Sequence, residues 1–387
     1  MNFSKKLIYI ANLRLPTEKA YGIQITKMCE TFSNLGINVV LIFPFRRSPH
    51  IKEDIYSYYS VRNNFEAKTI WTPDFYFPGR LDKLSFYIKS FISAVFLSIY
   101  ALVKKSDFIY SRDELPLFIL SFFRKNLIYE AHRFSNSRRL LYKRFKNKNF
   151  KVVVITKRLK DDFIKIDFRP ENILVAPDGV DLAEFGIDIS KEEARIKIGL
   201  PLDTRIAMYT GHLFEWKGAG VLLEAAKTYN LQPTTYNLLF TFVGGTEYDV
   251  KKFREKAKKM KLNNVLILSH KPHKEIPFFL RAADVLILPN SAKEEISKHY
   301  TSPLKLFEYM ASIRPIVACD LPSVREILND KNSVLFKPDN VDELNEGIKK
   351  VLNNNFLGEE LAKKARENIE DYTWQKRAEK IINFIDS

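Results

Sequence analysis

The residues His-Tyr-Thr-Ser-Pro-Leu-Lys-Leu-Phe-Glu-Tyr-Met at 299–310, continued by Pro-Ile-Val-Ala-Cys-Asp at 315–320, decide the fold that this sequence predicts. Ser302 and Pro303 predict a helix start, because a hydroxyl group can cap free backbone amides and proline needs no N–H donor at the first helical position. Apolar residues then recur with helical spacing until the next proline ends the helix. The apolar residues 316–318 after it predict a short buried strand.

Another buried strand is predicted just before this helix, in Ala-Asp-Val-Leu-Ile-Leu-Pro-Asn at 283–290. A helix that begins after a strand, with free amides and a nearby lysine, is a natural site for a phosphate group. Glu308 falls in the second turn of the helix, where a carboxylate can reach a ribose diol attached to that phosphate. The alternative is an ordinary capped helix with Glu308 as a surface charge, and these residues alone favour neither reading.

Two segments of this region resemble the nucleotide-sugar motif of the family 4 retaining glycosyltransferases of group 1 type: Ser-Pro-Leu-Lys-Leu-Phe-Glu-Tyr-Met-Ala at 302–311 and Arg-Pro-Ile-Val-Ala at 314–318. Those enzymes have the GT-B fold, in which two Rossmann-like, parallel-sheet α/β domains face each other across a cleft. The family motif carries two glutamates. The second matches Glu308, whereas Tyr300 stands in place of the first, which lies against the donor sugar in the family. The resemblance implies donor binding by Tyr300, Ser302, Pro303, Leu304 and Glu308.

Length and charge agree with such a protein. A chain of 387 residues, 46% of them hydrophobic, is long enough for about two globular domains. Its net charge of +16 favours anionic partners such as nucleotide diphosphates, anionic lipid surfaces or nucleic acids. Cys29 and Cys319 lie far apart in apolar patterns, which predicts reduced core residues. The apolar run at 7–10 is too short for a signal peptide and is expected to be the first strand.

The first half of the chain begins with a strand at 7–11, a helix that stops at Gly36 and a strand at 39–43. This order predicts a parallel βαβ unit with a right-handed crossover. Ligands bind beyond the carboxyl ends of such strands, so the intervening loop should line a site. The family often has a glycine-rich loop here, and Gly22 is the residue that the resemblance assigns to the donor. The alternative is a loop that only connects the two elements.

His132 ends a predicted strand at 127–132, at the position where catalytic groups collect in parallel sheets. In the family a histidine in a Glu-X-His arrangement at this point contacts the donor sugar, and Glu130 and His132 match that arrangement. The resemblance therefore implies a catalytic role for both residues. The alternative for a single histidine is a structural role.

The second half repeats the α/β pattern, with a strand at 205–211 followed by a polar loop. In the family this loop carries an arginine and a lysine that contact the donor diphosphate. Lys217 matches the lysine, and His212 stands where the arginine is usual. The resemblance implies catalysis and donor binding by Lys217, and donor contacts by His212. It also assigns Gly244, at the end of the next strand, and His270, in the loop usual for the nucleobase.

Residues 173–181 resemble the segment of the family that crosses between the domains. We expect a boundary near Phe185, which gives an acceptor-side Rossmann-like domain at 1–184 and a nucleotide-sugar-binding domain at 185–371. The helix in 372–387 is expected to cross back to the first domain.

Residues 84–103 are long and apolar enough to span a bilayer, with Lys89 as the only charge. Serines interrupt the segment and a predicted strand follows at 108–110, so a helix packed in a soluble domain is the favoured reading. Basic residues flank it, which leaves an interfacial role on a membrane open. The basic run at 138–148 is usually a solvated helix face, and contact with anionic lipid or an acidic glycan is the alternative.

The predicted function is transfer of a sugar from a nucleotide diphosphate sugar to an acceptor hydroxyl by a hexosyltransferase-type enzyme, in cell-surface polysaccharide or glycolipid synthesis. Retention at the anomeric carbon is implied by the resemblance. No metal-ligand spacing and no isolated Asp-X-Asp occur, so neither a metal nor another cofactor is expected. Lys217 and the helix amides after Ser302 would neutralise the diphosphate instead.

Two alternatives belong to other classes. A GT-B epimerase or hydrolase of UDP-sugars would use the same nucleotide site without an acceptor. A nucleic-acid binder is suggested by the charge of +16, but the basic residues are dispersed and no reader motif with stacking aromatics is present. The expected partners are the nucleotide sugar and a lipid-linked or saccharide acceptor. The expected location is the cytoplasm, with peripheral attachment to the anionic inner face of the cell membrane as a further expectation.

Overall fold

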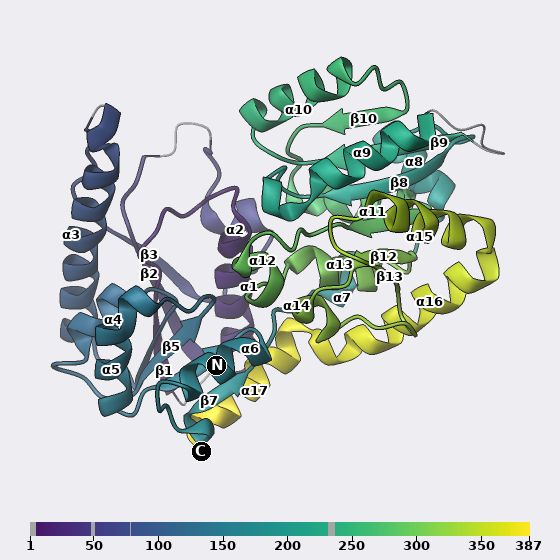
Figure 1. Ribbon diagram of the computed structural model, residues 1–387. Helices are drawn as coiled ribbons and strands as arrows, with labels where there is room; N and C mark the ends of the chain where they lie inside the picture. The colour runs from purple at the N-terminus through teal and green to yellow at the C-terminus, as the bar shows by residue number, and fades with distance from the viewer. Residues whose placement is uncertain (1–4, 48–50, 78, 231–236) are drawn as a thin grey trace. The chain divides into compact units, whose positions relative to one another are not determined.

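The computed structural model describes residues 5–47, 51–77, 79–230 and 237–387. The chain forms two units, and each is described by itself. The N-terminal unit comprises Met1–Pro177 and Trp374–Ser387, and the C-terminal unit comprises Asp178–Thr373. Each unit is built around one parallel sheet with helices packed on it (Figure 1). The predicted α/β class with two parallel sheets is therefore confirmed.

Seven parallel strands form the sheet of the N-terminal unit, in the order β3-β2-β1-β4-β5-β6-β7. Most are short apolar runs that helices cover on both faces, as parallel sheets require. The strands are β1 Lys5–Ile10, β2 Ile37–Pro44, β3 Glu66–Ile70, β4 Phe108–Ser111, β5 Leu127–Ala131, β6 Lys151–Val154 and β7 Ile173–Val175. The α-helices are α1 Ala20–Asn34, α2 Ile55–Tyr59, α3 Asp82–Val103, α4 Glu114–Leu120, α5 Arg139–Asn147, α6 Lys157–Ile164 and α17 Trp374–Asp386.

Six parallel strands form the sheet of the C-terminal unit, in the order β10-β9-β8-β11-β12-β13. The strands are β8 Arg205–Thr210, β9 Leu238–Val243, β10 Val265–Leu268, β11 Val285–Leu288, β12 Ile316–Cys319 and β13 Val334–Phe336. The α-helices are α7 Leu182–Phe185, α8 Lys191–Ile198, α9 Ala219–Asn230, α10 Glu247–Lys259, α11 Ile276–Ala282, α12 Glu295–His299, α13 Leu304–Ala311, α14 Pro322–Arg325, α15 Val341–Asn353 and α16 Asn355–Asn368.

Each sheet has one point at which the strand order reverses direction. It lies between β1 and β4 in the N-terminal unit and between β8 and β11 in the C-terminal unit. In open parallel sheets the loops diverge at this switch point, and ligands bind there beyond the carboxyl ends of the strands. The loops after these four strands are therefore the first places to look for a site.

The division between the units falls between Pro177 and Asp178, earlier than the predicted boundary at Phe185. The amide of Asp178 donates to the hydroxyl of Ser302, and the amide of Val180 donates to the carbonyl of Tyr372. Phe185 itself is buried in the core of the C-terminal unit. These contacts attach the predicted linker to the C-terminal unit.

The chain end belongs to the N-terminal unit, as the sequence suggests for a helix that returns to the first domain. Helix α17 packs against α1 and buries Ala378 and Ile381. A salt bridge between Lys5 and Asp386 joins the same helix to β1 at the surface.

Helix α3 distributes its side chains in an unusual way. Its small and polar residues Ser85, Ser93, Ala94 and Ser98 are buried, and the hydroxyls of Ser93 and Ser98 donate to carbonyls of the preceding helical turn. Leu97 is buried with them, but most of the large apolar residues are exposed, among them Leu84, Phe86, Tyr87, Phe91, Ile99 and Val103. The serines that argued against a membrane helix thus form the face that packs on the unit, along the side of α4 (Figure 1).

Among the described residues, α3 is the one helix whose length and composition would let it cross a membrane. The mean hydropathy of its most apolar stretch is 1.8, and 33% of that stretch is buried in the unit.

Candidate active site

Two loops of the C-terminal unit meet at its switch point. Gly218 follows the loop after β8, and a Cβ atom built on it would lie 1.7 Å from the carbonyl oxygen of Pro289, which follows β11. The φ of Gly218 is +74°, a conformation that favours glycine. The loops therefore pack backbone to backbone, and they place Lys217 beside the carboxyl end of β11.

Glycines also set the ends of β8 and β9. Gly211 and Gly244 have φ values of +119° and +122°, and a Cβ atom on Gly244 would lie 2.7 Å from the carbonyl oxygen of Gly211. Close approach of the two strand ends thus explains Gly244. Its contact with a donor stays a prediction.

Helix α13 begins at Leu304, later than the sequence predicted. Pro303 is the residue before the first helical one, with an extended ψ of 126°, and no side chain caps the helix there. Ser302 was predicted to be the cap, but its hydroxyl accepts the hydrogen bond from Asp178 at 2.9 Å. The correction strengthens the phosphate argument, because the amides of the first turn stay available to an anion.

Tyr309 fixes this helix to the sheet. Its phenolic oxygen accepts a hydrogen bond of 2.9 Å from the backbone N–H of Thr210, the last residue of β8. Every residue of α13 is buried. The helix N-terminus is therefore held rigidly near the end of β8.

Glu308 lies in the second turn of α13, as the sequence predicts; it is buried there and has a partner that sequence reasoning missed. His273 contacts the Glu308 carboxylate through Nε2 at 3.2 Å and the Glu184 carboxylate through Nδ1 at 3.0 Å. Burial opposes the charge on this histidine, but the two carboxylates outweigh it and raise the pKa of His273 to about 9. An imidazolium therefore bridges the two glutamates at neutral pH.

The predicted nucleobase contact His270 is exposed, three positions before His273 in the same loop. The segment His-Lys-Pro-His at 270–273 contains two histidines. The second, His273, packs inward in an edge-to-face contact with Phe185, with ring centroids 5.2 Å apart. A contact of His270 with a base stays a prediction.

Lys217 lies in the same neighbourhood. Burial lowers the pKa of Lys217 to about 8, against the attraction of the Glu308 carboxylate. Its ammonium group lies 4.5 Å from the ring centroid of Trp216. His212 stacks flat on Phe214, with centroids 4.8 Å apart, and its carbonyl accepts a hydrogen bond from Tyr209 at 2.6 Å.

Two further residues lie near the carboxyl edge of the C-terminal sheet. Tyr300, which replaces the first glutamate of the family motif, is half-buried just after α12. Lys305 in the first turn of α13 is buried, and sequence reasoning, which noted a lysine near this helix, assigned Lys305 no role. Only its position three residues before Glu308, and so on the same helix face, could have drawn attention to it.

In the N-terminal unit, Glu130 is the centre of a buried polar network at the end of β5. One of its carboxylate oxygens accepts hydrogen bonds from Gln24 at 2.7 Å, from Arg377 of α17 at 2.8 Å and from His132 at 2.7 Å. The hydroxyl of Tyr110 donates to the other oxygen. Burial alone would raise the pKa of Glu130, but Arg377 and His132 hold it well below its usual range.

The state of His132 follows from this network. Burial and the charge of Arg112 lower the pKa of His132 to about 4, although Glu130 opposes the shift. His132 is therefore neutral at physiological pH. Because an ionised carboxylate only accepts hydrogen bonds, the proton must sit on Nε2, and Nδ1 is left as an acceptor.

Gly22 has a packing reason of its own. A Cβ atom on this residue would lie 2.0 Å from the hydroxyl oxygen of Tyr59, so glycine is needed where α1 meets α2. The predicted contact of Gly22 with the donor stays a prediction.

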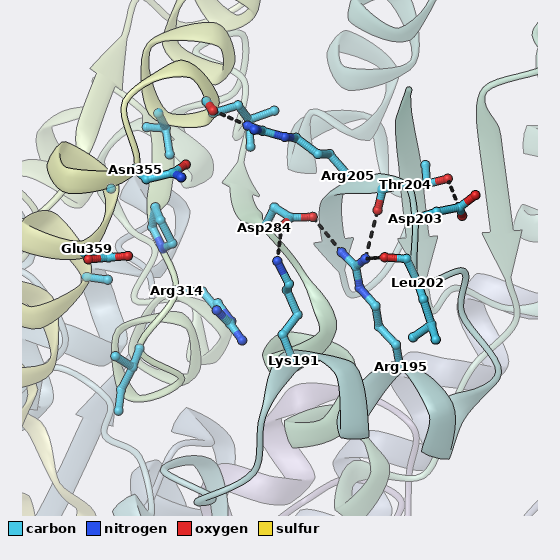
Figure 2. Close-up of a pocket in the computed structure, with 16 residues that line it drawn as sticks. Lys191, Arg195, Leu202, Asp203, Thr204, Arg205, Asp284, Arg314, Asn355 and Glu359 are labelled. Carbon is cyan, nitrogen blue, oxygen red and sulfur yellow. Dashed lines mark hydrogen bonds and ion pairs between the residues drawn. The ribbon is translucent and has the colours of Figure 1, made fainter. Parts of the chain in front are cut away.

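A pocket of about 410 Å³ lies at the opposite, amino-terminal edge of the C-terminal sheet (Figure 2). Asp284 pairs there with Lys191 at 2.8 Å and with Arg195 at 2.6 Å, as Figure 2 shows. Arg195 also donates to the carbonyls of Ala282, Pro201, Leu202 and Thr204. These ion pairs and hydrogen bonds hold α8 against the amino-terminal ends of the strands. The charged groups already have partners, so the pocket is a poor candidate for the active site.

The bridge between His273 and the two glutamates predicts a pH dependence of stability. The folded-state pKa of His273, about 9, lies above the ordinary value of about 6.5, so its contribution is complete below pH 6.5 and is lost as the pH rises through 9. We expect the free energy of unfolding to fall between pH 6.5 and 9.5 in urea titrations, and to fall less in His273→Gln. Equal slopes in the two proteins would contradict the bridge.

Comparison with known proteins finds similarities to glycosyltransferases. Residues 190–372 match the family model described as glycosyl transferases group 1. The putative teichuronic acid biosynthesis glycosyltransferase TuaC of Bacillus subtilis is 27% identical over 199 residues, which cover 51% of this chain and 45% of TuaC. The D-inositol 3-phosphate glycosyltransferase of Corynebacterium aurimucosum is 23% identical over 244 residues, 61% of this chain and 56% of that protein. The chain thus spans about half the length of these curated relatives.

The fold extends over the whole chain. The crystal structure of HepE from Anabaena in complex with UDP-glucose has a TM-score of 0.76 and 17% sequence identity, and it covers 99% of both chains. Its two parallel-sheet domains have the GT-B fold. This chain therefore has the GT-B fold, and its residues 190–372 are similar to the group 1 glycosyl transferases.

Proposed function

We propose that this protein is a retaining glycosyltransferase that moves a hexose from a nucleotide diphosphate sugar to an acceptor hydroxyl. One observation carries the proposal: Lys217, Glu308 and the uncapped N-terminus of α13 meet at the switch point of the C-terminal sheet. A cation, a carboxylate and free helix amides are the groups that a nucleoside diphosphate needs. That HepE binds UDP-glucose supports a uridine nucleotide as the first donor to test.

The chemistry assigned to these residues is stabilisation of a leaving group. As the bond between the anomeric carbon and the phosphate oxygen breaks, negative charge grows on the diphosphate. Lys217 and the amides of α13 are proposed to bind that charge, which gives them more effect in the transition state than in the ground state. Glu308 is proposed to accept hydrogen bonds from the ribose. No metal ion is part of this proposal.

His132 is proposed to contact the donor sugar. Its neutral ring, with the proton on Nε2, can accept a hydrogen bond from a sugar hydroxyl at Nδ1. Glu130 then acts by fixing the tautomer and the orientation of the ring.

A screen of nucleotide diphosphate sugars for thermal stabilisation tests the proposal. A ligand at 100 times its dissociation constant adds about 2.7 kcal/mol to the free energy of unfolding, which is a clear shift of the melting temperature. We expect one nucleotide sugar and its nucleoside diphosphate to stabilise the protein. No shift with any member of the panel would contradict the proposed donor site.

Glu308→Ala is expected to weaken donor binding by roughly 1.5–3 kcal/mol, because hydrogen bonds to a charged group are worth about that much. Calorimetric titration of the donor measures the change. Glu346→Ala, which removes an exposed glutamate of the same unit, should leave the affinity as it is. Unchanged affinity in Glu308→Ala would rule out the ribose contact.

For acceptor and place, we propose a lipid-linked or surface-polysaccharide precursor at the cytoplasmic face of a membrane. TuaC, named for teichuronic acid biosynthesis, supports a role in polysaccharide synthesis. The exposed apolar face of α3, with Phe86 63% and Val103 79% exposed, supports contact with lipid. Exposed lysines at its two ends, Lys83, Lys104 and Lys105, favour an anionic surface.

Co-sedimentation with liposomes tests this location. We expect binding to anionic liposomes at low salt and release at high salt, since each basic residue contributes about 1 kcal/mol and the attraction is screened. Phe86→Ser combined with Phe91→Ser should weaken binding, whereas Phe356→Ser, at an exposed position of the other unit, should not. Negligible binding to anionic and neutral liposomes alike would contradict the proposal. Binding that survives high salt and alkaline wash would mean that α3 spans the bilayer.

A further inference from the structure

We propose that Lys305 is a second cation for the donor diphosphate and acts beside Lys217. The inference rests on the proposed function, because it presumes a diphosphate at the carboxyl edge of the C-terminal sheet. It adds a side chain from the first turn of α13 to the binding groups of the loop and the helix N-terminus.

The first observation is a buried ammonium group without a hydrogen-bond partner. Lys305 is 7% exposed, and its Nζ forms no hydrogen bond with any residue in the described ranges. An ammonium group has three N–H donors, and burying it without acceptors is strongly unfavourable. Arg195, which is buried in the same unit, differs in this respect, because it donates to four carbonyls and to Asp284.

The second observation is where this ammonium group lies. Its Nζ is 3.6 Å from the ring centroid of Tyr209 in β8 and would be 3.1 Å from a Cβ atom on Gly211. Gly211 follows β8 directly, at the switch point, with a φ of +119°. The lysine thus reaches from the first turn of α13 to the end of the central strand, in the space that a side chain at position 211 would fill.

The third observation is the charge around Lys305. Lys217 repels it and the Glu308 carboxylate attracts it, so all three belong to one electrostatic group. Glu308 is itself bonded to the His273 imidazolium and is therefore only a partial counter-ion. The other titratable side chains there are Tyr209 and Tyr309, whose phenols already form hydrogen bonds, and Cys319, whose thiol is buried. Two lysines close to one partly neutralised carboxylate leave a positive excess that suits an anion of two or more charges.

Proton uptake follows from this arrangement. In the empty protein burial, and after it the charge of Lys217, hold the pKa of Lys305 well below its usual range. A bound diphosphate would raise that pKa, so the complex holds more protons than the free protein. Affinity should then increase as the pH falls, and calorimetric enthalpies in buffers of different ionisation enthalpy should reveal proton uptake. Lys217, with a pKa of about 8, also contributes to proton uptake, and its contribution is measured separately with the variant Lys217→Ala.

The test is calorimetric titration of UDP, and of other nucleoside diphosphates, into the full chain and into Lys305→Met. Met has a similar length and no charge, so we expect an unchanged or raised melting temperature together with binding weakened about tenfold or more. Proton uptake at pH 8 should also decrease. Lys350→Met, at an exposed position of α15, is the matched control and should bind as the unchanged protein does.

The outcomes separate the two proposals. If the unchanged protein binds UDP or another nucleoside diphosphate and Lys305→Met binds it within twofold, with the same proton uptake, Lys305 is a structural residue and this inference fails alone. If Lys305→Met is unstable, Lys305→Arg decides, because this variant keeps the positive charge. Binding of the nucleoside diphosphate by a stable Lys305→Arg supports the role of the charge, and loss of that binding in a fully stable Lys305→Arg contradicts it. If the unchanged protein binds no nucleoside diphosphate, the proposed function itself fails.

Discussion

Replacing Lys217 with alanine is expected to lower turnover by about 10²–10³-fold while weakening donor binding much less. The ammonium group of Lys217 lies at the switch point beside Glu308, where the proposed diphosphate gains charge as the sugar leaves. An interaction that strengthens in the transition state raises the turnover number, whereas one of constant strength changes only the Michaelis constant. A cation with a pKa of about 8 in the free protein also predicts that kcat/KM decreases above pH 8, where the ammonium form is lost before the donor binds.

Steady-state kinetics and calorimetric donor titrations on the same preparations measure the two effects separately. Lys227→Ala, at an exposed position of α9, controls for loss of one positive charge from the same unit. If Lys217→Ala raised only the Michaelis constant and left the turnover number intact, Lys217 would be a binding residue and its catalytic assignment would be wrong.

Replacing Arg377 with alanine is expected to destabilise the N-terminal unit by about 3–5 kcal/mol, the usual result of removing one partner of a buried ion pair. Arg377 and Glu130 have side chains that are 2% and 0% exposed, and their charged groups lie 2.8 Å apart. Arg377 also donates from Nε to the carbonyl of Pro177 at 3.0 Å. Without it, Glu130 would be a buried carboxylate with its main counter-charge gone.

Urea unfolding followed by fluorescence and circular dichroism measures this loss. Lys5→Ala is the matched control, because Lys5 forms an exposed ion pair with Asp386 of the same helix and such pairs are worth about 0–1 kcal/mol. The pKa of His132 should rise as well, because the charge of Arg377 contributes to lowering it. If Arg377→Ala unfolded at the same urea midpoint as Lys5→Ala, the buried ion pair would not be what holds α17 in place.

The sequence was sufficient for the parts of the structure that local patterns encode. Apolar runs separated by helical periods predicted both parallel sheets, and the motif around Glu308 placed that residue on the correct helix. The loop after β8 that carries Lys217 was predicted from the strand before it and the helix after it, whereas the role of Lys217 came from the resemblance and stays a prediction. These features depend on residues close together in the chain, where period and turn chemistry decide the outcome.

Contacts between distant segments were beyond that reasoning. Glu130 and Arg377 lie on β5 and α17, and nothing local to either residue indicates the other. The choice between His270 and His273 depends on which one packs against Phe185 and Glu308. From the sequence, Ser302 is predicted to cap the helix, whereas in the structure its hydroxyl accepts a hydrogen bond from the amide of Asp178.

Helix α3 shows a different limit. Its serines looked like interruptions of an apolar segment, because sequence reasoning assumes that large apolar residues face the protein. In the structure the serines satisfy their hydroxyls on helix carbonyls and pack inward, while Phe86 and Phe91 face outward. Composition predicts the length of such a helix and leaves open which of its faces packs.

The central claim is that the switch point of the C-terminal unit holds a nucleotide diphosphate sugar whose sugar is transferred with retention. The most direct test is proton NMR of the full chain with the nucleotide sugar that stabilises it most, in the presence of candidate acceptors. The account predicts release of the nucleoside diphosphate and a product, or first-formed free sugar, with the anomeric configuration of the donor. A product of the opposite configuration, an epimerised nucleotide sugar or an unconsumed donor would contradict it.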